Sequence, residues 1–192
     1  MRHFLHNSER AMVATRSATV RATSSKRGVA VETERTSKRQ RVETYTVGPA
    51  VLGDTEPLKN LMNGPELRQV YTKNAHEVPP MGYAYLQKVI EDKDCILLVI
   101  RLQGTEIVGY VYAYIDDECW YLAELLVLDK HRRQGLGPQL VHGVLEAAEK
   151  RKGTQLVSEV KLEAENDGLV LFYENLGFEK EEGSSTIMRF AL

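Results

Sequence analysis

The chain has 192 residues, 43% of them hydrophobic and 27% charged, which is enough for one domain with a sizeable core. No apolar run reaches membrane-spanning length, Cys95 and Cys119 form no Cys-x-x-Cys pair, and the five histidines are scattered. We therefore expect no membrane span, no disulfide framework and no metal site, and a reduced intracellular compartment fits best.

The net charge of −2 hides two regions of opposite sign. Residues 1–42 carry ten Lys and Arg against three Glu, or +7, which leaves 15 basic and 24 acidic side chains, or −9, in residues 43–192. The first region is rich in Ser, Thr, Ala and Arg without hydrophobic periodicity, so we expect a disordered basic tail. Residues 43–192 are expected to form one folded domain.

Two basic clusters in the tail, Lys26-Arg27 and Lys38-Arg39-Gln40-Arg41, are ten residues apart. This is the spacing of a bipartite nuclear import signal, which an import receptor would read. The alternatives are an idle tail on a cytoplasmic protein, a tail that binds nucleic acid, and a mitochondrial presequence, because the first twenty residues are rich in Arg, Ser and Thr. We expect a nuclear or cytoplasmic protein in preference to a mitochondrial one.

The first half of the domain predicts one strand followed by short helices. Alternation over residues 44–50 predicts the strand, and Asp54-Thr55-Glu56-Pro57 predicts the start of a helix that continues through Met62. After a break at Gly64-Pro65, two more helices are expected, over residues 66–71 and from Pro79 to Ile90.

Residues 95–128 predict a meander of three antiparallel strands. Two apolar runs, 95–102 and 107–115, are joined by a short turn, and Asp116-Asp117-Glu118 leads into a third run, 120–128, that only Glu124 interrupts. A long amphipathic helix is then expected from Pro138 to Lys152, ended by Gly153. The last predicted elements are a strand at 155–162, a helix at 169–176, and strands at 178–182 and 186–192. Together they predict an α/β domain with a mixed, mostly antiparallel central sheet flanked by helices.

The segment between the third strand of the meander and the long helix has the features of an anion-binding site. A helix N-terminus presents unpaired N–H groups and the positive end of the helix dipole. Gly135 and Gly137 let the backbone approach an anion, Arg132 and Arg133 add positive charge, and Pro138 suits the first helical turn. The same residues would also suit an ordinary strand-to-helix turn.

Two other phosphate motifs are absent from the sequence. Gly-x-x-x-x-Gly-Lys-Ser/Thr does not occur, and Leu140 stands where a dinucleotide fingerprint needs its third glycine, so we expect neither an ATP nor an NAD site. Instead, Arg132-Arg133-Gln134-Gly135-Leu136-Gly137 resembles the Arg/Gln-x-x-Gly-x-Gly/Ala signature of the GNAT superfamily of acyl-CoA-dependent N-acetyltransferases. A second motif of that family resembles residues 166–178, which include Phe172-Tyr173 and Leu176-Gly177-Phe178.

The resemblance implies acetyl-CoA as co-substrate and two mid-sheet strands that splay apart to form its cleft. It implies that the cofactor is bound by Leu125, Leu126, Val127, Arg132, Arg133, Gln134, Gly135, Leu136, Gly137, Pro138 and Asn166. The apolar residues among these are equally typical of any buried strand, and Asn166 could instead cap the helix that follows it.

Two residues are candidates for acid and base. Glu124 is a carboxylate within an apolar strand, and burial would raise its pKa toward the range in which it takes a proton from a substrate ammonium. It could instead pair with a Lys or Arg, point to solvent, or bind a cationic acceptor as in polyamine-type relatives. Tyr173 stands where the family places its general acid, or it could simply pack beside Phe172.

The acidic segments of the domain favour a cationic acceptor, namely a polyamine, a protein lysine or a basic N-terminus. No Ser-His-Asp or nucleophilic Cys arrangement is evident, so we expect direct attack by the amine, in a monomer or homodimer. The alternatives are a non-catalytic acyl-CoA-binding module and a nucleic-acid-associated interaction protein that depends on the basic tail.

Overall fold

The computed structural model describes residues 43–65, 82–152 and 157–192. The predictions for the tail at 1–42, for the helix at 66–71, for the helix start at Pro79 and for the helix end at Gly153 lie outside these residues.

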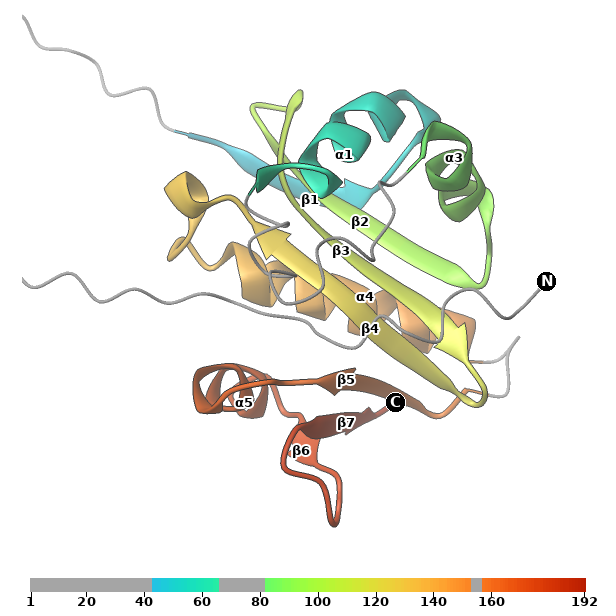
Figure 1. Cartoon of the computed structure of the whole chain (residues 1–192), viewed down its shortest axis with the longest axis vertical. Helices are drawn as coiled ribbons and strands as arrows, with labels where there is room; N and C mark the ends of the chain where they lie inside the picture. Colours follow the sequence, from blue (N-terminus) through green and yellow to red (C-terminus); the bar gives the residue numbers. More distant parts are fainter. Residues whose placement is uncertain (1–42, 66–81, 153–156) are drawn as a thin grey trace, which may run out of the picture.

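A seven-stranded sheet crosses the described part of the molecule in the order β1-β2-β3-β4-β5-β7-β6 (Figure 1). Neighbouring strands run antiparallel except β4 and β5, which run parallel. The predicted mixed, mostly antiparallel sheet and the meander at 95–128 are therefore confirmed. The strands are β1 (Tyr45–Pro49), β2 (Cys95–Leu102), β3 (Glu106–Asp116), β4 (Cys119–Val127), β5 (Glu159–Glu163), β6 (Glu179–Lys180) and β7 (Ile187–Ala191).

Helices cover both faces of this sheet. The described α-helices are α1 (Thr55–Met62), α3 (Tyr83–Glu91), α4 (Leu136–Arg151) and α5 (Asp167–Glu174), with 3-10 turns η1 (Leu52–Asp54) and η2 (Asp129–His131). Both α4 and α5 begin two residues earlier than predicted, directly after their N-cap residues Gly135 and Asn166. None of the described helices has the length and hydropathy of a membrane span.

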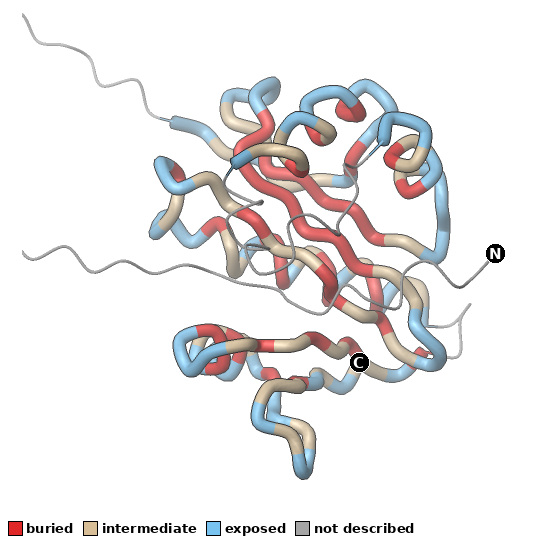
Figure 2. The backbone as a smooth tube through the Cα atoms, viewed as in Figure 1, coloured by how far each residue is buried: buried red, intermediate tan, exposed pale blue. Residues whose placement is uncertain are grey.

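The core consists of two apolar layers on opposite faces of the sheet, and the buried strands between them form the red centre of Figure 2. On one face, Trp120 and Leu122 of β4 pack with the apolar stripe of α4 and with α5. On the other face, Tyr110 and Leu126 pack with α1 and α3. The two faces of β4 therefore contact different sets of helices.

A β-bulge in β4 decides which face each of its residues occupies. Tyr112 pairs with Glu124 and Ala113 pairs with Leu122, so Ala123 is an extra residue on β4. One extra residue reverses the face of every residue that follows it. Strict alternation from Leu122 would put Glu124 on the α4 face, whereas the bulge puts it on the face of α1 and α3.

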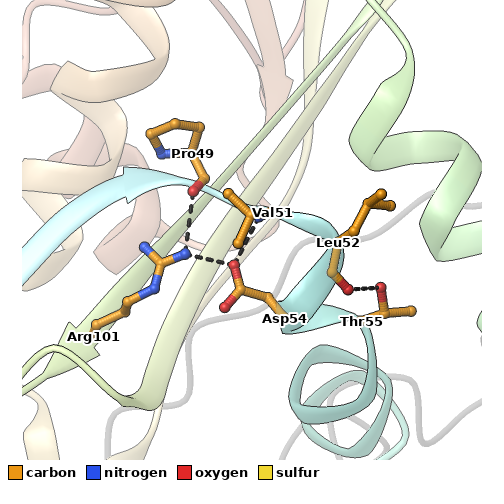
Figure 3. A network of polar contacts seen from close by, with 6 residues as sticks. All are labelled: Pro49, Val51, Leu52, Asp54, Thr55 and Arg101. Atoms are coloured by element: carbon orange, nitrogen blue, oxygen red, sulfur yellow. Dashed lines mark hydrogen bonds and ion pairs between the residues drawn. The ribbon is translucent and has the colours of Figure 1, made fainter.

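A largely buried ion pair fastens the segment between β1 and α1 to the end of β2, the strand next to the edge of the sheet (Figure 3). Arg101 of β2 donates to the carboxylate of Asp54 and to the carbonyl of Pro49 at 3.2 Å. The same carboxylate accepts from the N–H of Val51 at 2.7 Å, and the Thr55 hydroxyl donates to Leu52 at 2.6 Å. This network fixes where α1 starts above the sheet.

We expect Asp54→Ala to lower the free energy of unfolding by about 2 kcal/mol, somewhat less than for a fully buried pair, because it leaves Arg101 and the Val51 N–H without an acceptor. The side chains of Asp54 and Arg101 are only 12% and 18% exposed, whereas those of Glu106 and Lys130 are 52% and 62% exposed. Glu106→Ala is therefore the matched control and should cost less than about 1 kcal/mol. Urea denaturation of both variants measures the difference, and equal losses would contradict the anchoring role.

Candidate functional site

The strands β4 and β5 pair over a short length only. Their register covers three residue pairs, from Cys119–Glu159 to Tyr121–Lys161. Beyond Tyr121, β4 continues to Val127 alongside β3 alone, while β5 pairs with β7 (Figure 1). The splayed strands implied by the family resemblance are therefore present.

The register shows which β4 amides face the splayed side. Leu128 donates its N–H to Val108 at 2.9 Å, and residues of an antiparallel pair alternate between facing and avoiding their partner strand. The N–H of Leu126 thus points toward β3, whereas those of Leu125 and Val127 point away from it. Of the three residues predicted to offer backbone contacts to the cofactor, Leu125 and Val127 have their N–H groups on the splayed side. Leu126 has its N–H toward β3 and its side chain in the core.

Arg132 is bound to its own loop. Its Nε donates to the carbonyl of Val127 at 2.8 Å, and its guanidinium forms an ion pair with Asp129 at 2.8 Å. These contacts fasten the end of β4 to the segment that leads into α4. Arg132 therefore shapes the loop through two identified partners, and its contact with the cofactor stays a prediction.

The loop before α4 has a backbone suited to an anion. Arg133 and Gly135 have left-handed φ values of 61° and 73°, and Gly135, as the N-cap, contributes no side-chain acceptor to the first turn of α4. A Cβ added at Gly135 would meet nothing within 4 Å, so the space above the helix start is open. Leu136 is buried, and Pro138 lies in the first turn as predicted. The loop thus fits the phosphate groups of an acyl-CoA.

The second predicted motif lies against this loop. A Cβ on Gly137 would come within 3.4 Å of the Phe172 ring, so α5 packs close to the N-terminus of α4. Tyr173 is 1% exposed and its ring packs on Phe172 and Phe178, with centroids 4.9 and 5.5 Å away. Burial raises the pKa of Tyr173, so it remains protonated at neutral pH.

Asn166 caps α5. Its side chain accepts a hydrogen bond from the N–H of Leu169 at 3.0 Å, and the residue itself is exposed. This is the alternative that the sequence left open for Asn166. Its contact with a cofactor stays a prediction.

Glu124 lies on the opposite face of the sheet from Tyr173. Its Oε2 accepts a hydrogen bond from the hydroxyl of Tyr110 at 2.7 Å, and Tyr110 is fully buried on the neighbouring strand. Tyr110 is thus one identified partner, and its hydrogen bond keeps the carboxylate on the α1 and α3 face. A hydrogen bond to a carboxylate is stronger than one between neutral groups, so it fixes the position of Glu124.

A group of tyrosines beside Glu124 escaped the sequence analysis. Tyr110, Tyr112 and Tyr114 occupy every second position of β3, and such residues share one face of a strand. This alternation is the sequence signal that could have revealed the group. The ring centroids of Tyr114 lie 5.8 Å from Tyr112 and 5.7 Å from Tyr121. From α3, Tyr85 packs against the core cluster that contains Tyr112. Burial raises the pKa of these hydroxyls at Tyr85, Tyr112 and Tyr114, so this wall is aromatic and uncharged.

Neither cysteine has the properties of a nucleophile. Burial raises the pKa of the Cys95 thiol, which contacts the Tyr112 hydroxyl at 3.7 Å, and it raises the pKa of Cys119 to about 11. A thiol protonated at neutral pH is a weak nucleophile. Among residues 43–65, 82–152 and 157–192, no group of three His, Cys, Asp or Glu side chains could hold a metal ion.

The model of the acetyltransferase (GNAT) family matches residues 64–178 of the chain. The chain belongs to the GNAT acetyltransferase family. This match confirms two predictions, that the chain is a GNAT protein and that acetyl-CoA is its co-substrate. The sheet and helices confirm the predicted fold. No curated protein matches the chain.

Solved structures of GNAT proteins share the fold. The PaiA N-acetyltransferase of Thermoplasma acidophilum, solved with coenzyme A, is 17% identical, with a TM-score of 0.58 over 78% of this chain and 99% of that one. The ribosomal-protein-S18-alanine N-acetyltransferase of Escherichia coli is 16% identical, with a TM-score of 0.55 over 77% and 94%. The spermidine N-acetyltransferase of Vibrio cholerae, solved with CoA and spermine, is 19% identical, with a TM-score of 0.57 over 77% and 95%.

Proposed function

We propose that the protein transfers an acetyl group from acetyl-CoA directly to a primary amine that is cationic in water. The acceptor classes are a protein lysine, a protein N-terminus and a polyamine. The observation that carries this proposal is the placement of Glu124, a partly buried carboxylate beside the opening between β4 and β5. An anionic side chain among uncharged tyrosines attracts an ammonium group and can take its proton.

The loop and β4 would hold the co-substrate. The N–H groups at the start of α4, exposed by Gly135, suit the diphosphate, and the N–H groups of Leu125 and Val127 suit the pantetheine arm and the thioester oxygen. When bound, acetyl-CoA supplies an activated acetyl group and a thiol leaving group. Donors that point at a developing oxyanion stabilise it without any rearrangement of the protein.

We assign the proton transfers of the reaction to Glu124 and Tyr173, which lie on opposite faces of the sheet. Glu124 takes a proton from the ammonium, directly or through one water, and the neutral amine becomes the nucleophile. The amine nitrogen forms a bond to the acetyl carbon, the C–S bond breaks, and the nitrogen loses its second proton to water. Tyr173, which burial keeps protonated, gives its proton to the departing sulfur, and exchange with solvent then restores the Tyr173 hydroxyl and the Glu124 carboxylate. The opening between β4 and β5 connects the two faces, so the amine and the thiol approach from different sides.

Exposed acidic residues support a cationic acceptor. Asp94 accepts from the N–H of Ile115 at 3.0 Å, which puts the acidic segment 91–94 beside the acidic turn 116–118. Two such segments together create a negative potential at the end of α3 and of the β3–β4 hairpin. The solved relatives named for an S18 alanine and for spermidine represent two of the three acceptor classes, so they do not choose between them.

A panel of acceptors tests the proposal. Labelled acetyl-CoA is incubated with the protein and with lysine-containing peptides, peptides with free N-termini and polyamines. We expect transfer to at least one cationic class. Acetyl-CoA that binds but is transferred to none of them would favour the non-catalytic module.

We expect Glu124→Gln to reduce kcat by about 100-fold at neutral pH and by much less at pH 9 to 10, because a larger share of the amine is neutral there without a base. The glutamine keeps an oxygen that accepts from Tyr110, so the fold should be unchanged. Tyr110→Phe is the control, since it removes that hydrogen bond and retains the carboxylate. A pH–rate profile for each variant gives the answer, and a uniform rise in the KM for the amine would instead assign Glu124 to substrate binding.

We expect Tyr173→Phe to lower kcat by on the order of 100-fold while leaving the KM for acetyl-CoA nearly unchanged, because only the proton donor is lost. The phenyl ring retains the contacts with Phe172 and Phe178, so the melting temperature should fall little. Steady-state kinetics with a thiol reagent measures both constants. Turnover equal to that of the wild type would remove Tyr173 from the mechanism.

A further inference from the structure

The hydroxyl of Tyr45, at the start of the edge strand β1, reaches the loop that follows β4. Tyr45 pairs with Leu102 at the end of β2, and Gly109 near the start of β3 pairs with Val127 at the end of β4. The start of β1 and the end of β4 therefore lie at the same end of the strands of the sheet, where η2 and α4 begin. A residue 86 positions earlier in the chain can thus touch the loop at His131.

Two side chains meet at this hydroxyl. It donates a hydrogen bond to the carboxylate of Glu43, and it lies 2.9 Å from Nδ1 of His131. The rings of Tyr45 and His131 also pack edge to face, with centroids 5.7 Å apart at 74°.

The hydrogen-bonding capacity of a phenol assigns a direction to each contact. A tyrosine hydroxyl has one proton and two lone pairs, and Glu43 takes the proton. His131 Nδ1 must therefore donate to a lone pair of the hydroxyl, so Nδ1 carries a proton. Its Nε2 is buried and finds no hydrogen-bond partner among the described residues, and His131 is only 4% exposed. The Tyr45 contact is thus the identified polar partner that fixes the ring.

We infer that Tyr45 is a positioning residue for the acetyl-CoA loop: its hydroxyl holds the buried ring of His131, so that the segment from η2 to the first turn of α4 meets the diphosphate. The inference rests on the proposed cofactor site. The segment contains Arg133 and Gly135, both in left-handed conformations, and such a conformation in arginine persists only where surrounding contacts maintain it. A loop ordered before binding loses less conformational entropy when its ligand arrives.

Tyr45→Phe tests this role, because it removes the hydroxyl and keeps the ring that packs on His131. We expect the Kd for acetyl-CoA to rise by about 3- to 10-fold, the effect of one lost hydrogen bond. Tyr83→Phe is the matched control, since Tyr83 is 47% exposed on α3 and should change nothing. Isothermal titration calorimetry measures binding without any acceptor amine.

Two fragments of the co-substrate separate positioning from general loosening of the fold. 3′-Phospho-ADP carries the diphosphate, and Tyr45→Phe should weaken it as much as acetyl-CoA. S-Acetylpantetheine lacks the diphosphate, and its affinity, measured by competition, should stay within 2-fold of the wild type, a margin of roughly 0.4 kcal/mol. Equal weakening of both fragments would overturn the inference.

A double-mutant cycle with His131→Ala gives a second test of the same contact. If Tyr45 acts through His131, the two changes together should raise the Kd by less than the product of their separate effects. Additive free-energy losses would show that Tyr45 does not act through His131 and would overturn the inference. Wild-type protein that failed to bind acetyl-CoA would overturn the proposed function and this inference together, whereas tight binding by both the wild type and Tyr45→Phe would overturn this inference alone.

Discussion

The three residue pairs that join β4 to β5 are the constraint on which the site depends. Full pairing would use every N–H of β4 within the sheet, and no backbone donor would remain for a ligand. The amides of Leu125 and Val127 point away from β3, and because pairing with β5 stops at Tyr121, no strand among the described residues pairs with them there. Buried N–H groups need partners, and the pantetheine arm of an acyl-CoA is one that matches a strand edge.

The bulge at Ala123 gives this opening two chemically different sides. It turns Glu124 toward α1 and α3, while Leu125 continues the face that packs on α4. The close approach of β3 supports the arrangement, because an added Cβ at Gly109 would lie 2.7 Å from the carbonyl oxygen of Leu126. A carboxylate on one side and the buried Tyr173 on the other separate the two proton transfers in space.

The sequence predicted the strands and helices well where hydrophobic periodicity or turn chemistry was strong, as in the meander and in α4. It also predicted the loop at Arg132 to Pro138, because two family motifs occur in the right order. It did not reveal the bulge, since Trp120 to Leu128 is apolar on both faces and no alternation marks the extra residue. Nor could it place Tyr45 beside His131, because contacts between residues so far apart depend on the completed sheet.

Amide hydrogen exchange measured residue by residue by NMR, with and without saturating acetyl-CoA, tests the central claim most directly. Leu126, paired with β3, should exchange slowly in both states, whereas Leu125 and Val127 should exchange faster in the free protein and become protected when acetyl-CoA binds. Binding that left the exchange of Leu125 and Val127 unchanged would contradict the account.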